Sequence, residues 1–474
     1  MSRRVRNVKD PGRILILGAG PTGLGAAWRC QELEVPDWKV LEAQPVPGGL
    51  ARSVVDSHGF TWDLGGHVQF SHYPYYDRVL DEALGAQGWL WHERRAFVHL
   101  EDHEVPYPLQ HNLHRLPPSI RSLAISGLLA ALERPAEAPA PLDFREWLRG
   151  TFGEPLCRIF FWPYNRKVWS HPLEDMSVSW VRERVALPDR DELERQLVCS
   201  EDFVSWGPNR KFRFPREGGT GAIWRAVCAL LPPERFHFGV RVVELDLSRR
   251  LVRTQTGEIF RYDTLLTTMA LSSTLSLAHG ASSLLQEAAR ALRANAVHFV
   301  GLGFRGGFPE RFRGWGWVYF PEPQVPPYRV TVFSNYSPAH VPDPGCWSLL
   351  CEIASVPGVL PDLRQLAHRT LEALRQEGFI PTEAVLVSVW THSEPYGYPI
   401  PTLGRDRALE ILLPGLARHR VFSRGRFGAW RYEVSNQDHS FMQGVECVDH
   451  LCGIGEEKTL FVDAPVPTSS ESRR

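Results

Sequence analysis

The most constraining feature of this chain is a glycine-rich turn between a short apolar run and a helical stretch. Residues 13–17 (Arg-Ile-Leu-Ile-Leu) predict a strand buried on both faces, and Gly18-Ala-Gly20-Pro-Thr-Gly23 follows directly. A helical pattern continues to about residue 33, and residues 38–42 predict a second strand that ends on Glu42. This order predicts a βαβ unit that opens a doubly wound sheet.

The same turn predicts a dinucleotide site. Glycines let the backbone approach a pyrophosphate, the helix N-terminus offers a positive dipole, and an acid such as Glu42 accepts hydrogen bonds from ribose hydroxyls. Two further glycine pairs, Gly48-Gly49 and Gly65-Gly66, follow, and the second stands directly before His67. These pairs favour FAD over NAD. Near the C-terminus Gly425-Arg426-Phe427-Gly428 precedes a predicted helix and is placed to cap the far end of the cofactor.

Length and composition bound the remaining possibilities. The chain has 474 residues, which at about 150 residues per domain predicts about three domains. The formal net charge is -1, which removes the electrostatic case for nonspecific nucleic-acid binding. The eight cysteines are scattered without a C-x-x-C pair, so we expect no metal site and a cytoplasmic, reduced protein. No apolar run approaches the roughly 18–20 residues of a membrane span, and we expect no signal peptide.

The pattern along the chain predicts three regions. Helical periodicity at 119–133, 142–152, 154–169 and 177–187 predicts a helical region, interrupted by an exposed proline-rich loop at 133–142. Aromatic runs at 297–304, 316–320, 329–334, 347–354 and 385–391 predict an antiparallel sheet, and 261–269 predicts a strand that rejoins the first sheet. Residues 464–474 predict a disordered tail.

The predicted fold class is therefore α/β. A discontinuous Rossmann-type FAD-binding domain is expected at 1–90, 210–295 and 400–474. An inserted helical domain is expected at 110–205, and an antiparallel β-sheet substrate domain at 91–109 and 296–399.

Short motifs rich in aromatic, arginine and asparagine residues follow one another through these regions. They are Gly-Gly-His67-Val-Gln-Phe70-Ser-His72-Tyr, Val-Pro-Tyr107-Pro, Pro-Tyr-Asn165-Arg-Lys-Val-Trp169, Glu-Arg184-Val-Ala, Trp-Gly-Pro-Asn209, Tyr319-Phe-Pro-Glu, Pro-Tyr-Arg329, Gly-Tyr398-Pro, Gly-Arg426-Phe-Gly-Ala-Trp-Arg-Tyr432 and Asn436-Gln437-Asp-His-Ser440. In this order, over roughly residues 13–455, the chain resembles the eukaryotic type of UDP-galactopyranose mutase.

The resemblance implies a flavin-dependent isomerase without net redox. In such enzymes N5 of reduced FAD attacks the anomeric carbon of the sugar and expels the nucleoside diphosphate. The flavin–sugar adduct opens, the sugar recloses through a different hydroxyl, and the diphosphate returns. The default substrate pair is UDP-galactopyranose and UDP-galactofuranose, and NAD(P)H is a possible reductant.

The resemblance also implies roles for individual residues. Arg184 and Arg329 would hold the diphosphate, because a guanidinium gives two parallel hydrogen bonds to phosphate oxygens. The other implied residues fall into groups: Tyr319, Tyr398 and Tyr432 as hydroxyl donors to the phosphates; Asn209 near the sugar on a mobile loop; Tyr107, Leu109, Gln110, Asn165 and Trp169 at the nucleoside; and Arg426, Asn436, Gln437 and Ser440 at the flavin. His67 lies on the loop beside flavin N5, with a general base or a purely structural role as alternatives.

One departure from the family pattern concerns the base. The family has an aromatic residue two positions after the tyrosine that stacks on the base, and Leu109 stands there in this chain. We expect UDP binding weaker than usual for the family. The alternatives to a mutase are an FAD-dependent oxidoreductase of the amine-oxidase or protoporphyrinogen-oxidase type, and a flavin-binding protein without catalysis.

Overall fold

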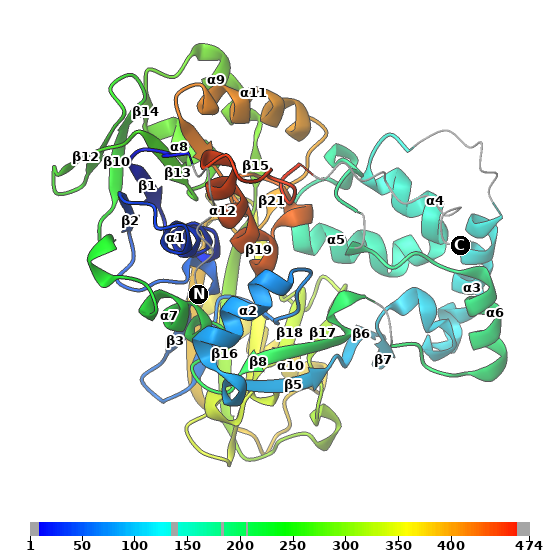
Figure 1. The fold of residues 1–474 in the computed structure, drawn as a ribbon. Helices are drawn as coiled ribbons and strands as arrows, with labels where there is room; N and C mark the ends of the chain where they lie inside the picture. The colour runs from blue at the N-terminus through cyan, green and yellow to red at the C-terminus, as the bar shows by residue number, and fades with distance from the viewer. Residues whose placement is uncertain (1–8, 134–140, 182–183, 205–206, 462–474) are drawn as a thin grey trace.

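The computed structural model describes residues 9–133, 141–181, 184–204 and 207–461 (Figure 1). Its central element is a five-stranded parallel sheet in the order β22-β13-β1-β2-β9. The strands are β1 (Ile14–Leu17), β2 (Trp38–Glu42), β9 (Phe236–Phe238), β13 (Thr264–Thr267) and β22 (Val421–Ser423). The predicted βαβ unit and the strand that rejoins the first sheet are both confirmed.

Strand β1 is buried on both faces, as its apolar run predicts. Ile14 and Ile16 belong to one core, and Leu15 and Leu17 belong to another on the opposite face. The first core packs against α1 (Pro21–Glu32), α2 (Pro74–Leu84), α7 (Gly221–Ala229) and α12 (Gln437–Leu451). The second packs against α8 (Leu271–Leu277), α9 (Ser283–Ala291) and α11 (Arg405–Ala417), and against a four-stranded sheet of β12 (Ile259–Arg261), β11 (Leu251–Thr254), β10 (Val242–Asp246) and β14 (Ala278–His279). The sheet is thus doubly wound.

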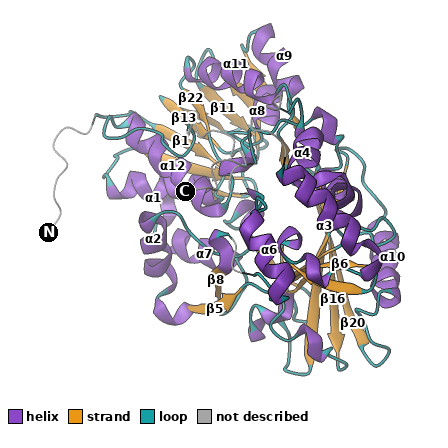
Figure 2. Cartoon of the chain, turned by 90° about the vertical axis from the view of Figure 1, so that its right-hand side faces the viewer, coloured by secondary structure: helices purple, strands orange, loops and turns teal. Residues whose placement is uncertain are grey.

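The second large sheet has seven strands in the order β20-β16-β19-β18-β17-β6-β7. They are β20 (Val385–Glu394), β16 (Ala296–Arg305), β19 (Cys346–Ser355), β18 (Arg329–Val332), β17 (Trp317–Tyr319), β6 (Ala96–Leu100) and β7 (His103–Pro106), with α10 (Leu363–Gln376) packed on one face. All five predicted aromatic strands lie here. The sheet is antiparallel except where β17 pairs in parallel with β6. The two large sheets occupy the upper and lower halves of Figure 2.

A group of helices forms a separate layer beside the two sheets, at the right of Figure 1. They are α3 (Pro118–Leu132), α4 (Phe144–Leu156), a π-helical turn (Cys157–Phe161), α5 (Trp162–Trp169) and α6 (Arg190–Cys199). The Asp143 carboxylate caps α4 by accepting a hydrogen bond from the backbone N–H of Glu146 at 2.8 Å. Their apolar faces share one core with β6, β7 and the turn at Leu109–His111.

The helix predicted at 177–187 is wrong. The described residues of that range hold no α-helix, and α6 lies further on. Backbone groups of this segment form hydrogen bonds with distant residues instead of within a helix. The N–H of Ser177 donates to the carbonyl of Pro401. The carbonyls of Ala186 and Leu187 accept from the side chains of Gln110 and His111. Pro188 also disfavours a helical conformation at the residue before it.

Three short ribbons complete the fold. They pair β3 (Ser53–Val55) with β4 (Thr61–Asp63), β5 (Trp89–Glu93) with β8 (Lys211–Pro215), and β15 (Arg293–Ala294) with β21 (Pro399–Ile400). The predicted tail at 464–474 and most of the predicted loop at 133–142 lie outside the described residues. Over the ranges described, the structure has no helix long and apolar enough to cross a membrane. The domain boundaries stay a prediction.

Candidate functional site

A cavity of about 560 Å³ lies between the two large sheets. The ends of β1, β13 and β22, the N-termini of α1 and α12, and strands β16 to β20 supply its wall. Ligands of open α/β sheets bind at the carboxyl ends of the strands, which is where this cavity begins. Most predicted site residues line it: Gly18, Gly20, Glu42, Gly49, Gly65, Gly66, His67, Tyr107, Arg184, Asn209, Tyr319, Arg329, Tyr398, Arg426, Tyr432, Asn436, Gln437 and Ser440.

The two glycine turns of the predicted dinucleotide site touch each other. The N–H of Gly48 donates to the carbonyl of Ala19 at 2.9 Å, and a Cβ on Gly20 would stand 3.7 Å from Gly49 Cα. Neither Gly23 nor Gly48 lines the cavity. Gly23 instead closes the turn, because a Cβ there would fall 1.8 Å from the carbonyl oxygen of Gly18. The result is a cradle of bare backbone.

The acid and the helix at this cradle fit an FAD. One carboxylate oxygen of Glu42 accepts from the N–H of Ala19 and the other from the N–H of Gln44, both at 2.7 Å. These bonds fix the carboxylate, and its remaining lone pairs are available to ribose hydroxyls. Helix α1 begins after Gly20 with no side-chain cap, so its first-turn N–H groups suit a pyrophosphate.

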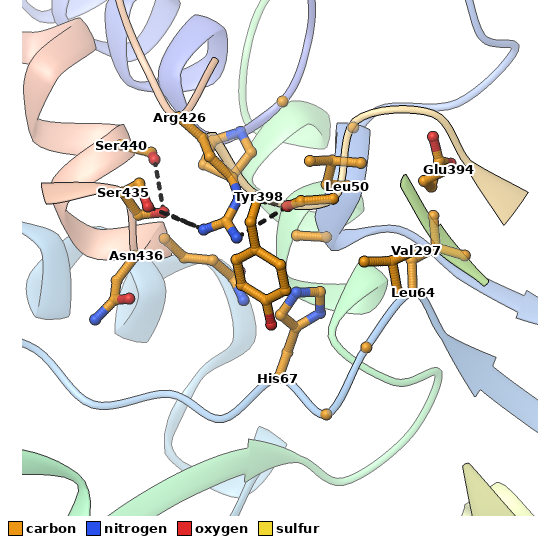
Figure 3. Close-up of a pocket in the computed structure, with 18 of the residues that line it drawn as sticks. Leu50, Leu64, His67, Val297, Glu394, Tyr398, Arg426, Ser435, Asn436 and Ser440 are labelled. Carbon is orange, nitrogen blue, oxygen red and sulfur yellow. Dashed lines mark hydrogen bonds between the residues drawn. The ribbon is translucent and has the colours of Figure 1, made fainter. Parts of the chain in front are cut away.

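His67 follows the glycine pair that borders the middle of the cavity. Its Nδ1 is buried and finds no hydrogen-bond partner among the described residues. Burial, with Arg329 and Arg426 nearby, lowers the pKa of His67 to about 4 although Glu352 opposes the shift. The imidazole is therefore neutral near pH 7. Figure 3 shows its ring beside that of Tyr398.

Arg426 is fixed by backbone and hydroxyl oxygens. Its Nε and Nη2 donate to the carbonyl of Gly397 at 3.2 and 3.0 Å, and its Nη1 donates to Ser435 Oγ at 2.9 Å (Figure 3). The guanidinium carbon lies 4.9 Å from the ring centroid of Tyr398. Within the described ranges no carboxylate pairs with it, so it adds positive charge to the cavity.

Arg329 is paired with a buried acid that the sequence analysis missed. Its Nη2 donates to both carboxylate oxygens of Glu352, at 2.8 and 2.7 Å, and its Nε donates at 3.1 Å. The same carboxylate accepts from the N–H of Gly66 and from the hydroxyl of Tyr328. Burial alone would raise the pKa of Glu352, but Arg329 and these donors hold it below its usual range.

Arg184 approaches the cavity from the helical layer. Its Nη1 donates to Asn436 Oδ1 and its Nη2 to the carbonyl of Glu433, both at 2.8 Å. Its Nε is buried and lacks a hydrogen-bond partner in the part of the chain that is described. The guanidinium lies 5.3 Å from the ring centroid of Tyr432. An anion in the cavity would supply the missing acceptor.

Tyrosine hydroxyls add neutral donors to these cations. Burial raises the pKa of Tyr319 and of Tyr398, so both hydroxyls keep their protons and can donate to an anion. Tyr107 meets Tyr319 edge to face, with centroids 5.1 Å apart. On the same side Arg94 Nη1 donates to Asn209 Oδ1 at 2.7 Å. Two residues of the predicted mobile loop around Asn209, at 205 and 206, lie outside the described residues.

Four residues expected at the nucleoside do not line the cavity. Leu109 is fully buried in the helical core, and Trp169 is 1% exposed. The amide of Gln110 donates to the carbonyl of Ala186 at 2.6 Å, and that of Asn165 donates to Phe161 at 2.8 Å. Trp169 instead supports the site from behind, since its ring packs edge-on against Tyr432 with centroids 4.9 Å apart.

Several lining residues escaped the sequence analysis: Leu50, Leu64, Val297, Tyr328, Glu352 and Glu394. Only Glu352 carried a usable signal. It is the one charged residue in the apolar run Cys346–Ser355, and a charge inside a buried strand needs a partner. The apolar members cannot be told from ordinary core residues by pattern.

Two groups of histidine and acidic side chains in the described ranges bring possible ligand atoms within 4.8 Å of one another. They are His72, Asp438 and His439, and His99, Asp102 and Glu377. Asp438 lines the cavity and its carboxylate lies 2.7 Å from Nδ1 of His72 and 3.1 Å from Nδ1 of His439. Burial alone would raise the pKa of Asp438, but the two histidines hold it well below its usual range.

Comparison with known proteins agrees with this geometry. The family model for flavin containing amine oxidoreductase matches residues 21–432. A crystal structure of reduced UDP-galactopyranose mutase superposes with a TM-score of 0.92 at 41% identity, covering 96% of this chain and 97% of that one.

More distant structures share the fold. A protein from Exiguobacterium sp. 255-15 that is proposed to be a protoporphyrinogen oxidase has a TM-score of 0.69 at 16% identity, covering 93% of this chain and 98% of its own. A fatty acid isomerase from P. acnes that produces CLA has a TM-score of 0.63 at 15% identity, covering 94% and 99%. The FAD cradle, the cavity beyond it and the match over nearly the whole length lead to one conclusion: this chain belongs to the flavin-containing amine oxidoreductase family and, within it, to the UDP-galactopyranose mutases.

Proposed function

We propose that this protein interconverts the pyranose and furanose forms of a nucleotide sugar, with UDP-galactopyranose and UDP-galactofuranose as the substrate pair. The observation that carries the proposal is one cavity that joins an FAD cradle to a group of half-buried arginines and tyrosine hydroxyls. A leaving group that must depart and return needs to be held in place, and such a cluster suits a diphosphate.

The side chains divide this work. Arg184 offers its unpartnered Nε, and Arg329 offers a charge whose carboxylate partner lies behind it on β19. Tyr319, Tyr398 and Tyr432 contribute hydroxyls from three separate segments. Charged hydrogen bonds to phosphate are roughly twice as strong as neutral ones, so the arginines supply most of the attraction and the tyrosines fix its direction.

The flavin end is arranged for close approach. A Cβ on Gly66 would fall 2.7 Å from Thr331 Oγ1, so this position needs glycine for the loop to lie against β18. Reduced FAD, when bound, supplies the nucleophile for the anomeric carbon. His67 is neutral and therefore adds no charge beside the flavin; its proposed role is to shape the loop there, with a general base or a purely structural role as the alternatives. Asn436, Gln437 and Ser440 at the start of α12 face the same end of the cavity.

Two finer statements are also proposals. NAD(P)H is proposed as the reductant that converts the flavin to its reduced form before turnover; the isomerisation itself consumes no reducing equivalents. A cytoplasmic location is proposed because all eight cysteines are unpaired, as expected of a reducing compartment.

The test is turnover under strictly anaerobic conditions, with the flavin either oxidised or reduced by dithionite. We expect UDP-galactofuranose to convert to UDP-galactopyranose only with reduced enzyme and without consumption of reductant. In a parallel assay in air, amine- or porphyrinogen-dependent oxygen uptake with formation of peroxide, and no sugar conversion in the anaerobic assay, would instead identify an oxidase of the wider family. Isomerisation by fully oxidised enzyme would contradict the flavin role.

A further inference from the structure

Lysine is rare in this chain and one lysine occupies an unusual place. Only five of the 53 basic residues are lysines: Lys9, Lys39, Lys167, Lys211 and Lys458. Lys167 lies on α5, inside a sequence motif whose neighbours Asn165 and Trp169 turn away from the cavity. Its Nζ contacts the loop that joins β17 to β18. Burial lowers the pKa of Lys167 to about 7 although Glu322 opposes the shift, so the group is mostly an ammonium below that pH.

That loop has few donors for its own carbonyls: the N–H of Phe320 donates to the carbonyl of Tyr328, but prolines remove many of the other donors. It runs from Phe320 to Tyr328 and contains four prolines, Pro321, Pro323, Pro326 and Pro327, none of which has a backbone N–H. A buried carbonyl without a donor costs free energy comparable to a lost hydrogen bond. The loop therefore needs donors from elsewhere.

Lys167 provides them. Its Nζ lies 2.7 Å from the carbonyl oxygen of Phe320, 3.0 Å from that of Glu322, 2.6 Å from that of Val325 and 2.8 Å from that of Pro327. An ammonium carries three N–H donors on one compact, tetrahedral centre, whereas a guanidinium is planar and presents a fork. Four converging carbonyls can share these three donors around one centre, which favours lysine at this position in a chain whose basic residues are mostly arginine.

The residues at both ends of this loop include a tyrosine and an arginine that we propose to hold the diphosphate. Tyr319 stands directly before it, and Tyr328 and Arg329 directly after it. Tyr319 and Arg329 are also register partners of the antiparallel pair β17 and β18. Any slackening of the loop therefore changes the relative position of a proposed donor and a proposed cation. Lys167 itself does not line the cavity.

From this arrangement we propose that Lys167 is a positioning residue for diphosphate recognition: by gathering four carbonyls of the β17–β18 loop, it holds Tyr319 and Arg329 in the geometry that grips the nucleoside diphosphate. The inference rests on the proposed function for the identity of the ligand. It does not make Lys167 a catalytic residue, since its side chain does not line the cavity.

The test compares Lys167→Met, which keeps the apolar stem, with Lys167→Arg, which keeps the charge but not the tetrahedral donors. UDP affinity is measured by calorimetry and kcat/KM by sugar conversion, both with reduced holoenzyme. Misplacement of catalytic groups by about 1 Å can cost roughly 100-fold, so we expect Lys167→Met to lose about 10- to 100-fold in UDP affinity and in kcat/KM. Lys167→Arg should lose less but remain below wild type, and it tests the inference even where the methionine variant does not fold.

Chemical rescue separates positioning from packing. Lys167 also borders an open surface pocket of about 520 Å³, through which a small amine can reach the four carbonyls after truncation to alanine. We expect propylammonium to restore UDP binding to Lys167→Ala, and we expect neither propanol nor tetramethylammonium to do so, because the first lacks charge and the second lacks N–H donors. Equal rescue by propanol would show that Lys167 acts by packing alone and would overturn the proposal.

Two controls separate the positioning role of Lys167 from the proposed function. Lys39→Met removes another partly buried lysine, whose ammonium lies 6.0 Å from the ring centroid of Phe260, and should leave UDP binding unchanged. Wild-type protein that binds UDP but converts no sugar would refute the proposed function and leave the binding test of Lys167 intact. Wild-type affinity in both Lys167→Met and Lys167→Arg would refute the positioning role, whatever the activity.

Discussion

Replacing Glu352 by glutamine removes one charge from the most buried ion pair of the cavity. The carboxylate is 1% exposed and accepts hydrogen bonds from Arg329, Tyr328 and Gly66. Glutamine keeps the shape and one acceptor oxygen, but it leaves the guanidinium of Arg329, whose side chain is only 20% exposed, without a counter-charge. Breaking a buried pair by removing one partner typically costs about 3–5 kcal/mol.

The expected loss can be measured as a melting temperature. At about 2.1 cal/mol/K per residue the unfolding entropy of the 474-residue chain is roughly 1 kcal/mol/K. If the chain unfolds as one unit, the melting temperature of Glu352→Gln should therefore fall by about 3–5 °C. Glu310→Gln is the matched control, because Glu310 pairs with Arg313 at 2.6 and 2.8 Å on the open surface, where such pairs are worth about 0–1 kcal/mol.

The effect of UDP distinguishes this argument from general destabilisation. In the wild type the carboxylate competes with an incoming phosphate for Arg329, whereas in Glu352→Gln the phosphate becomes the only counter-charge. UDP should therefore raise the melting temperature of the variant by more than it raises that of the wild type. Calorimetric scans with and without UDP measure both shifts. A smaller rise in the variant, or an unchanged melting temperature without UDP, would refute the reasoning.

Three further predictions follow from the same geometry. Arg184→Ala should lower kcat/KM by about 30- to 1000-fold, the effect of losing a charged hydrogen bond worth roughly 2–4 kcal/mol, while the flavin absorbance spectrum stays that of the wild type. Because the pKa of His67 is lowered to about 4, the histidine is neutral above that pH, so kcat/KM should show no inflection between pH 5 and 8 that His67→Gln removes. In the unfolded chain the same histidine takes up a proton near pH 6.5, so the free energy of unfolding that His67 contributes should fall as the pH drops from about 6.5 to about 4. Chemical denaturation of the wild type and of His67→Gln over this pH range measures the difference. Leu109 is fully buried in the helical core, so Leu109→Phe should cost about 1–3 kcal/mol of stability by overpacking. Calorimetry should show an unchanged preference for UDP over dTDP and purine diphosphates. A change in base preference would show that Leu109 faces the nucleoside.

The nucleotide-binding half of the protein was predictable because its constraints are local. A strand buried on both faces shows as an unbroken apolar run, and a turn with no room for a Cβ shows as glycine. Both signals lie within residues 13–42 and need no knowledge of the rest of the chain. The aromatic strands of the second sheet were equally predictable from their alternating pattern and aromatic composition, and all five predicted segments lie in that sheet.

Motif resemblance located the candidate site but not the contacts within it. The residues that it identified, among them Arg184, Arg329 and the tyrosines, line one cavity in the structure. It also assigned Leu109 and Gln110 to the nucleoside, whereas the structure places one in the core and ties the other to the carbonyl of Ala186. Sequence position alone does not say which face of a helical turn meets a ligand.

Only the tertiary structure decided how charges and carbonyls are matched across the chain. Arg329 meets Glu352 from the adjacent strand β19, and Lys167 meets four carbonyls more than 150 positions away. Partners of this kind follow from burial, since a charge or a carbonyl withdrawn from water must find its counterpart wherever packing brings one. For Arg329 the choice depends on which strand pairs with β18, and for Lys167 it depends on how the helical layer packs on the sheet; no local pattern in the sequence encodes either.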